Sequence, residues 1–190
     1  RLKEFADWPI MLMWGMKDWC FRPECLDRLE SHWPKAEIHR IADAGHYVIE
    51  DAREQATEAL IDSNKKMVET LSNGKLGYIH ISRMMWDEFE KFEQHLYENG
   101  SGKDGVVIDV RDNGGGFTTD HLLTALTQPR HAFTVPRNGG RGYPQDRFVY
   151  ATWNRPITVL CNQNSFSNAE IFSHAITTLK RGKVVGVASA

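Results

Sequence analysis

A serine at the start of a predicted helix is the first residue of this sequence that could do chemistry. Ser167 follows the apolar run 157–161, and Glu170 stands three residues after it. A serine hydroxyl at a helix N-terminus meets unpaired N–H groups and the positive end of the helix dipole, where an oxyanion is stabilised. The same Ser-x-x-Glu spacing is a capping box, in which the two side chains only terminate the helix. Position alone leaves both interpretations open.

A glycine-rich segment after another buried run is the second candidate. The run 106–110 leads directly into Arg111, Asp112, Asn113 and the glycine triplet 114–116. Glycines let backbone amides approach a ligand because no Cβ stands in the way. The triplet lacks the G-x-x-x-x-G-K-[ST] spacing of a phosphate-binding loop, so we discount phosphate binding. A tight turn that needs positive φ angles is the structural alternative.

An acid and a base near the beginning of the chain form the third candidate. Asp18 and His46 each lie in a short loop that follows a predicted strand. A carboxylate that orients an imidazole is half of a nucleophilic-catalysis set, because it fixes the tautomer and stabilises the imidazolium. The structural alternative is that Asp18 caps a turn and His46 packs in a loop.

The sequence indicates neither a metal nor a cofactor. Cys20 and Cys25 lie near His32 and His39, but their spacing departs from C-x2-C and no second pair exists. The large aromatic residues are expected to form core, since they surround predicted elements or recur at helical spacing. The residues expected to be buried are Trp8, Trp14, Trp19, Phe21, Trp33, Trp86, Phe89, Phe92 and Leu96.

The elements that must position these residues alternate between strand and helix, which is an α/β pattern. Strands are separated from one another by helices or long loops, and a Pro/Gly-rich excursion interrupts the second half over 128–147. The predicted strands are 10–14, 36–41, 76–81, 105–110, 157–161 and 184–188, and the predicted helices are 23–33, 49–71, 86–97, 119–127 and 168–179.

Composition excludes several classes of protein. The 190 residues are 41% apolar and carry a formal charge of -2, so no overall positive charge is available to hold a nucleic acid or an anionic membrane. The longest strongly apolar run, 9–14, is far too short to span a bilayer. Three cysteines at low density fit a reducing compartment, and we expect a cytoplasmic protein without a nucleic-acid or membrane partner.

Two partial domains fit the length and the pattern best. Apolar periodicity is weakest between 55 and 74, which places one unit at 1–60 and another at 65–190. The last apolar run, KVVGVASA, stops at Ala190 without a closing helix, so we expect the second unit to be truncated.

The second unit resembles the catalytic core of the S41 serine peptidases, the tail-specific and tricorn-like proteases, a crotonase/ClpP-like fold. The resemblance rests on GYIHI, KDGVVIDVRDNGGG, RPITVLCNQNSFSNAEIF and GKVVGVASA in that order. It implies that Ser167 is the nucleophile and that the amide of Asn168 and one amide of the Gly115–Gly116 pair form the oxyanion hole. It also implies a peptide or unfolded-protein substrate, and the excursion would help to shape a substrate groove.

The resemblance does not supply a general base. In the tail-specific branch a lysine would fall beyond Ala190. In the tricorn-like branch a histidine comes from before GYIHI and a glutamate from beyond the end of this sequence. The histidines present in the second unit are expected to be ordinary structural ones: His80, His95, His121, His131 and His174.

The first unit resembles the C-terminal end of an α/β-hydrolase of the haloalkane-dehalogenase-like branch. The residues that carry this resemblance are PIMLMWGMKDWCF and DAGHYVIEDA, within about 7–56. It implies that Asp18 is the acid and His46 the base, with the nucleophile upstream of both. The sequence shows no nucleophile elbow before Asp18.

The leading hypothesis is therefore a serine endopeptidase-like protein that is incomplete as a catalyst. One alternative is an α/β-hydrolase fragment that acts on ester or carbon–halogen bonds. Another is a catalytically silent fragment or structural subunit, and a homo-oligomer is left open. Ser167, Asp18 and His46 formally complete a triad, but the parts belong to unrelated scaffolds and would need hydrogen-bond reach.

Overall fold

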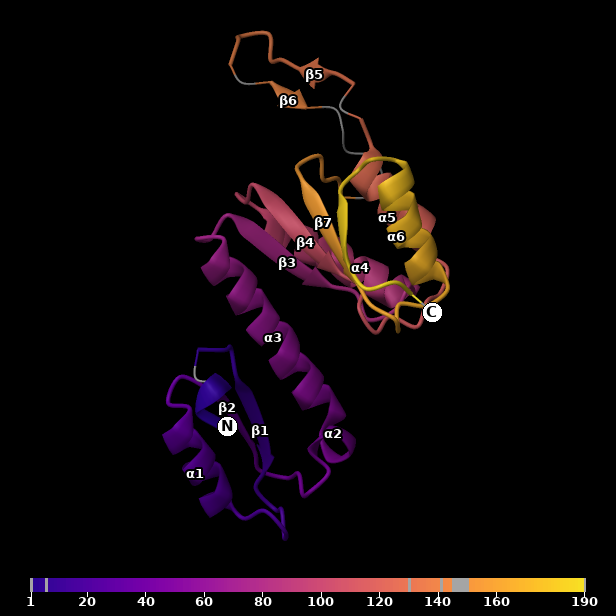
Figure 1. The fold of residues 1–190 in the computed structure, drawn as a ribbon. Helices are drawn as coiled ribbons and strands as arrows, with labels where there is room; N and C mark the ends of the chain where they lie inside the picture. Colours follow the sequence, from indigo (N-terminus) through magenta and orange to yellow (C-terminus); the bar gives the residue numbers. More distant parts are fainter. Residues whose placement is uncertain (1, 6, 130, 141, 145–150, 190) are drawn as a thin grey trace. The chain divides into compact units, whose positions relative to one another are not determined.

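The computed structural model describes residues 2–5, 7–129, 131–140, 142–144 and 151–189 (Figure 1). The chain divides into two compact units, Arg1–Ser63 and Asn64–Ala190, and each is described by itself. No helix among the described residues is both long and apolar enough to cross a membrane.

The first unit is built on two parallel strands. The 3-10 helix η1 (Leu2–Phe5) precedes β1 (Met11–Gly15), α1 (Pro23–His32), β2 (Glu37–Ile41), α2 (Val48–Asp51) and the beginning of α3 (Arg53–Leu71). Strands β1 and β2 pair in register from Met11 opposite Glu37 to Gly15 opposite Ile41. A Cβ on Gly15 would lie 2.0 Å from the carbonyl oxygen of Gly45, so glycine lets the loop after β1 meet the loop after β2.

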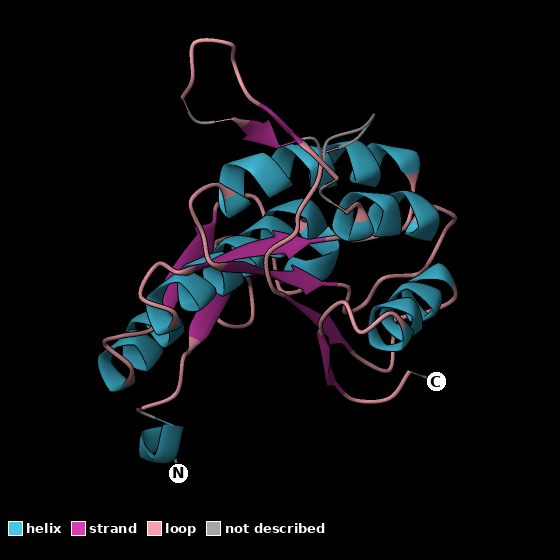
Figure 2. Cartoon of the chain, turned by 90° about the horizontal axis from the view of Figure 1, so that it is seen from above, coloured by secondary structure: helices cyan, strands magenta, loops and turns pink. Residues whose placement is uncertain are grey.

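The second unit contains a four-stranded parallel sheet. Its strands are β3 (Leu76–His80), β4 (Gly105–Asp109), β7 (Ile157–Cys161) and β8 (Lys183–Gly186), and they lie in that order. Helices α4 (Trp86–Gly100), α5 (Thr119–Thr127) and α6 (Asn168–Thr178) connect them, and the short strands β5 (Phe133–Thr134) and β6 (Tyr143–Pro144) lie between α5 and β7. The strands fan out with the twist typical of such sheets (Figure 2).

The hydrophobic core of the second unit lies on one face of this sheet. Ile79, Ile108 and Val159 stand side by side in register on β3, β4 and β7, and all three are fully buried. The helices cover them with apolar side chains, namely Phe89, Phe92, Leu96, Leu122, Leu126, Ala169, Phe172 and Ile176. Side chains alternate between the two faces along a strand. This packing therefore fixes the register of each strand and the orientation of the residues at its end, where the loops begin.

The predicted α/β class is confirmed, but two expectations about the first half are wrong. The predicted helix 49–71 is two helices, α2 and α3, separated at Ala52, whose φ of -139° is not helical. The aromatic residues expected in the core are partly on the surface: Trp19 is 80% exposed, and Trp8, Phe21 and Trp86 are also exposed. In the first unit, a two-stranded sheet with one packed helix offers too little apolar surface to cover large rings. Trp86 is the first residue of α4, in the second unit.

Candidate active site

Ser167 stands at the turn that connects β7 to α6. Its backbone has φ 54° and ψ -116°, and the residue is exposed. Positive φ is strained for a residue with a Cβ, and such strain is concentrated at functional sites. A sharp, strained strand-to-helix turn is also the setting in which nucleophilic serines of other hydrolases present their hydroxyl.

Hydrogen bonds within the first helical turn hold this conformation. The Ser167 amide donates to Oε2 of Glu170 at 2.7 Å, and the Ser167 carbonyl accepts from the amides of Glu170 and Ile171 at 3.0 and 3.1 Å. The capping box predicted from the Ser-x-x-Glu spacing is therefore formed, with both of its side chain-to-backbone pairings. Just before the turn, buried Ser165 donates to the Val110 carbonyl at 2.7 Å, which ties the loop to β4.

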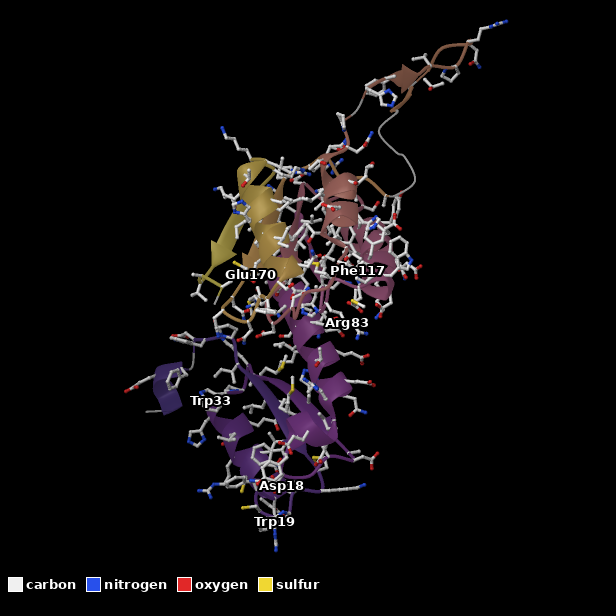
Figure 3. All side chains as sticks on the ribbon, turned by 90° about the vertical axis from the view of Figure 1, so that its right-hand side faces the viewer. Asp18, Trp19, Trp33, Arg83, Phe117 and Glu170 are labelled. Carbon is white, nitrogen blue, oxygen red and sulfur yellow. The ribbon has the colours of Figure 1, made fainter. Side chains whose placement is uncertain are left out.

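The glycine triplet lies directly against Ser167. A Cβ on Gly115, where φ is 89°, would be 2.8 Å from the Cβ of Ser167 and 3.1 Å from the Asn168 amide nitrogen. A Cβ on Gly116 would be 2.0 Å from the Met84 carbonyl oxygen. The bend therefore fits between the loop after β3 and the start of α6 only because it has no side chains. Phe117 follows the glycine triplet, and Glu170 lies in the first turn of α6. Both lie at the same end of the second unit as Arg83 (Figure 3).

The hydrogen bonds show which amides are available to a ligand. The Gly115 amide donates to Oδ1 of Asn113 at 2.8 Å, so it is already used. Within the described residues, the amides of Gly116 and Asn168 have no protein acceptor. An oxyanion hole at this site would therefore use Gly116 from the predicted pair, together with Asn168.

Asn113 is a site residue that the sequence reasoning missed. Its side chain is fully buried, and Nδ2 donates to the Ile81 carbonyl at 2.8 Å while Oδ1 accepts from Gly115. Its own carbonyl accepts from the Phe166 amide at 2.9 Å. Asn113 thus joins the end of β3, the glycine bend and the residue before Ser167. The only sequence signal was an asparagine before a glycine run, which looks like an ordinary turn.

The side chain of Asn168 has a structural role as well. Its Oδ1 accepts from the Thr119 amide at 2.9 Å, and the Thr119 hydroxyl donates to the Asn168 carbonyl at 2.8 Å. These bonds fix the starts of α5 and α6 to each other. The Asn168 amide is therefore held in place by groups on a second helix.

A buried carboxylate lies just before the bend. Asp109 is 1% exposed, and its oxygens accept a forked pair of bonds from Arg111 and a bond from the Tyr78 hydroxyl at 2.7 Å. Burial alone would raise the pKa of Asp109, but the hydrogen bonds from Arg111 and Tyr78 outweigh it and lower the pKa. Burial and the bond to Asp109 raise the pKa of Tyr78, and the bond to Asp109 raises the pKa of Arg111, so all three groups keep their charge state at neutral pH.

This network predicts an acid-sensitive contribution to stability. A lowered pKa means that the stabilisation by Asp109 is complete above its ordinary pKa of about 3.9 and is lost as the pH falls through the lowered value. Asp109→Asn should cost about 2 kcal/mol at pH 7, and this difference should shrink below about pH 4. Urea unfolding, monitored through hydrogen exchange of the β3 and β4 amides, measures this difference in the free energy of unfolding.

The exposed Asp104→Asn variant is the control, and it should differ little from the parent protein at any pH. A cost of Asp109→Asn that is unchanged at pH 3 would contradict the assignment.

No base for Ser167 is found in the described part of the second unit. No histidine or lysine there forms a hydrogen bond to the Ser167 hydroxyl. His121 packs against the rings of Trp86 and Phe89, with centroids 5.1 and 5.6 Å away. His80 is half-buried beside Asp109, and burial lowers its pKa. Packing and burial determine the positions of these two histidines, and neither is hydrogen bonded to Ser167.

In the first unit the structure brings Asp18 and His46 together. Nδ1 of His46 lies 3.1 and 3.2 Å from the two carboxylate oxygens of Asp18. Oδ1 of Asp18 also accepts from the amides of Cys20 and Phe21 at 2.7 and 2.9 Å. Burial would raise the pKa of Asp18, but the Phe21 and Cys20 amides and His46 lower it. A carboxylate held in this way orients the imidazole and leaves Nε2 without a partner among the described residues.

Aromatic side chains surround this pair. The rings of Tyr47, Phe21 and Trp19 lie 5.1, 5.4 and 6.1 Å from the His46 ring, measured between centroids. All three are exposed, and Asp18 and Trp19 lie together in Figure 3. The described residues contain no group of three or more histidine, cysteine or acidic side chains arranged to hold a metal ion.

Comparison with known proteins agrees with the two units. Residues 75–190 match the family model "Peptidase family S41", and residues 2–52 match "alpha/beta hydrolase fold". The Tricorn protease of Thermoplasma volcanium is 31% identical over 140 residues, which cover 73% of this chain and 13% of that protein. The crystal structure of the tricorn protease aligns with a TM-score of 0.61 at 28% identity, and covers 73% of this chain and 13% of that one.

The first unit has a different relative. Cis-3-alkyl-4-alkyloxetan-2-one decarboxylase of Shewanella oneidensis is 39% identical over 54 residues, which cover 28% of this chain and 17% of that protein. The chain thus spans less than a fifth of the length of each of these relatives. Since the S41 model covers more than half of its residues, the chain belongs to peptidase family S41, with an α/β-hydrolase-like segment before the matched region.

Proposed function

We propose that the second unit is a serine peptidase core that acts on peptides or unfolded polypeptides. Ser167 is the nucleophile, and the amides of Asn168 and Gly116 stabilise the oxyanion that forms when its oxygen attacks a peptide carbonyl. The observation that carries the proposal is the strained, exposed backbone of Ser167 packed against Gly115. A residue that only capped α6 would not need positive φ, because N-cap residues ordinarily have extended backbone angles.

Proton transfer from the hydroxyl needs a base that the described residues of this unit do not place beside Ser167. On this proposal the base comes from outside the unit, as expected for a chain that spans 13% of its Tricorn relative. The isolated chain should therefore react slowly and once per molecule, with no rapid turnover. The amide donors remain, and one such donor is worth about a hundredfold in rate.

Labelling by a fluorophosphonate probe tests this proposal. We expect slow incorporation of one probe per chain, measured by intact mass, and complete loss of labelling in Ser167→Ala. Ser101→Ala, which removes another exposed serine at the end of α4, should label like the parent protein. Equal labelling of the Ser167→Ala and parent proteins would contradict the proposal.

We also propose a second candidate function for the first unit, because Asp18 and His46 are hydrogen bonded as an acid and base of nucleophilic hydrolysis. In this role the pair would assist attack on an ester or carbon–halogen bond by a nucleophile that another polypeptide supplies. The exposed rings of Trp19, Phe21 and Tyr47 would bind the apolar part of the substrate.

Hydrolysis of a small aromatic ester separates the two functions. In the isolated chain water is the available nucleophile, and His46 would accept its proton. This slow hydrolysis by the first unit should survive Ser167→Ala and fall to background in His46→Ala and Asp18→Ala. His32→Ala, a change at an exposed histidine of α1, is the matched control and should leave the rate unaltered. Hydrolysis that is indifferent to His46→Ala would rule out this second function.

A further inference from the structure

Two strained residues, Asp112 and Ser167, lie in the loops that follow the neighbouring strands β4 and β7. Among the described residues, the other positions with positive φ that are not glycine are Asn73 and Lys180. Each of these comes two residues after the end of a helix, where a left-handed residue commonly terminates the helix. Asp112, with φ 57°, follows a strand instead, so its conformation needs a separate physical cause.

The Asp112 side chain joins the two loops. Its Oδ1 accepts from Nδ2 of Asn164 at 2.7 Å and from Nδ2 of Asn162 at 3.1 Å. The Asp112 amide donates in turn to Oδ1 of Asn162 at 2.9 Å, 50 residues later in the chain. We call these three residues the polar clamp. Because one carboxylate oxygen receives two amide donors, the polar clamp fixes the loop after β7 to the loop after β4.

The polar clamp lies immediately before the candidate active site on both loops. Asp112 precedes Asn113, whose carbonyl accepts from the Phe166 amide at 2.9 Å. Asn164 stands three residues before Ser167. A shift of the polar clamp therefore moves the serine turn relative to the glycine bend, which follows Asn113 directly.

Backbone geometry alone does not account for an aspartate at this position. Positive φ is unfavourable for any residue with a Cβ, although aspartate tolerates it better than most. Glycine adopts such angles freely, and the chain uses it for this purpose at Gly115, where φ is 89°. The two bonds that the Asp112 carboxylate accepts are what a glycine would lack. We therefore attribute the side chain at this position to these bonds.

Solvent exposure makes the effect of the polar clamp local. Asp112 and Asn164 are exposed and Asn162 is partly exposed, so little packing reinforces the three residues. Hydrogen bonds to a charged acceptor are stronger than those between neutral groups. The core is packed independently of them, from buried apolar side chains of the strands and helices. Loss of the polar clamp should therefore release the serine turn and leave the rest of the unit folded.

We propose that Asp112 is a positioning residue for the chemistry of Ser167. Through Asn162 and Asn164, its carboxylate sets the distance between the Ser167 hydroxyl and the amides assigned to the oxyanion hole. Asp112 acts in this role through the loop and touches no reacting atom. A displacement of about 1 Å at a reacting group can cost on the order of a hundredfold in rate. The inference rests on the peptidase function proposed above and extends it to a residue outside the reacting groups.

Three substitutions of Asp112 separate its backbone from its carboxylate. Asp112→Gly keeps the positive φ but removes the acceptor, so labelling of Ser167 by the fluorophosphonate probe should fall at least about tenfold. Its urea midpoint should stay close to that of the parent protein. Asp112→Asn retains an oxygen at the Oδ1 position and tolerates positive φ, so it should label nearly as fast as the parent protein. Asp112→Ala loses both features and should lower labelling and stability together.

A double-mutant cycle assigns the effect to the bond itself. Asn164→Ala removes one of the two donors and should also slow the labelling of Ser167. The double variant Asp112→Gly/Asn164→Ala should label at the rate of Asp112→Gly alone, because the bond is already lost. Gln163→Ala, at the exposed residue between the two asparagines, is the matched control and should label like the parent protein.

Hydrogen exchange at the Phe166 amide provides a readout that does not need a reactive serine. This amide donates to the Asn113 carbonyl, so it should exchange when the serine turn moves away from the glycine bend. Loss of a hydrogen bond to a charged group should make that opening about tenfold more frequent in Asp112→Gly. Asp112→Asn should restore the exchange rate of the parent protein.

The possible results distinguish this inference from the peptidase proposal. Labelling of Ser167 that is equal in Asp112→Gly and the parent protein would overturn the inference and leave the peptidase function intact. Phe166 exchange that Asp112→Gly does not change would also overturn it, and so would Asp112→Asn that labels as slowly as Asp112→Gly. A parent protein that is not labelled would reject the peptidase function, while faster exchange in Asp112→Gly would still support control of the turn by Asp112.

Discussion

Gly115→Ala should reduce fluorophosphonate labelling of Ser167 by about a hundredfold. The added Cβ would stand 2.8 Å from both the Ser167 Cβ and the Phe166 carbonyl oxygen, at a residue whose φ of 89° already disfavours a side chain. Both the glycine bend and the serine must move apart, which separates the hydroxyl from the Gly116 amide. We also expect a loss of about 1–3 kcal/mol in the free energy of unfolding. Labelling kinetics and urea unfolding measure the two effects.

The neighbouring Gly114→Ala variant is the matched control. A Cβ at Gly114 would have no atom within 4 Å, and its φ is not positive. This variant should label and unfold like the parent protein. If Gly114→Ala and Gly115→Ala behave alike, the contact between the bend and Ser167 does not control reactivity.

Asn113→Ala should be the most destabilising single change at the site. It leaves the buried Ile81 carbonyl and the Gly115 amide without their partners, and an unsatisfied buried group costs about 1–3 kcal/mol. We expect a loss of about 2–4 kcal/mol in the free energy of unfolding of the second unit. Hydrogen exchange of the β3 and β4 amides under increasing urea measures this loss. Labelling of Ser167 should fall too, because the freed Gly115 amide no longer holds the bend.

Two further variants separate the effect of the Asn113 hydrogen bonds from the effect of replacing an asparagine elsewhere. Asn138→Ala, at an exposed position between β5 and β6, should leave both stability and labelling unaltered. Asn113→Asp keeps the acceptor for Gly115 but removes the donor to Ile81, so it should retain more labelling than Asn113→Ala. An Asn113→Ala protein as stable as the parent would show that Asn113 does not join the three loops.

Local signals in the sequence were sufficient for the parallel strands of the second unit and the helices between them, but they did not predict the short strands β5 and β6. The run ITVLC predicted β7 as 157–161, and the Ser-x-x-Glu spacing placed the start of α6 at Asn168, both as observed. Each buried strand of the parallel sheet appears in the sequence as a short apolar run. Such a run can be recognised from neighbouring residues alone. The order of these elements also carried the family resemblance.

Tertiary contacts decided what the sequence could not predict. The positive φ of Ser167 and the burial of Asn113 depend on how the bend meets the loop after β3, which is about thirty residues earlier in the chain. The exposure of Trp19 shows the opposite failure, because residue type predicted a core that a two-stranded unit does not build.

On the functions proposed above, the two units contribute different halves of hydrolytic chemistry. Ser167 has amide donors and no histidine or lysine hydrogen bonded to it among the described residues, whereas Asp18 and His46 form an acid–base pair without a serine beside them in their own unit. Each assignment therefore has its own variants and controls. Loss of one activity with retention of the other is an informative result for both.

The most direct test compares two serines in one protein. Peptide mapping after brief fluorophosphonate treatment gives the rate of labelling at Ser167 and at Ser101 in the same sample, first folded and then in urea. If the folded turn activates Ser167, its rate should exceed that of Ser101 by about a hundredfold in the native chain, and the two rates should become equal on unfolding. Equal rates in the folded protein would contradict the claim that this serine is a nucleophile.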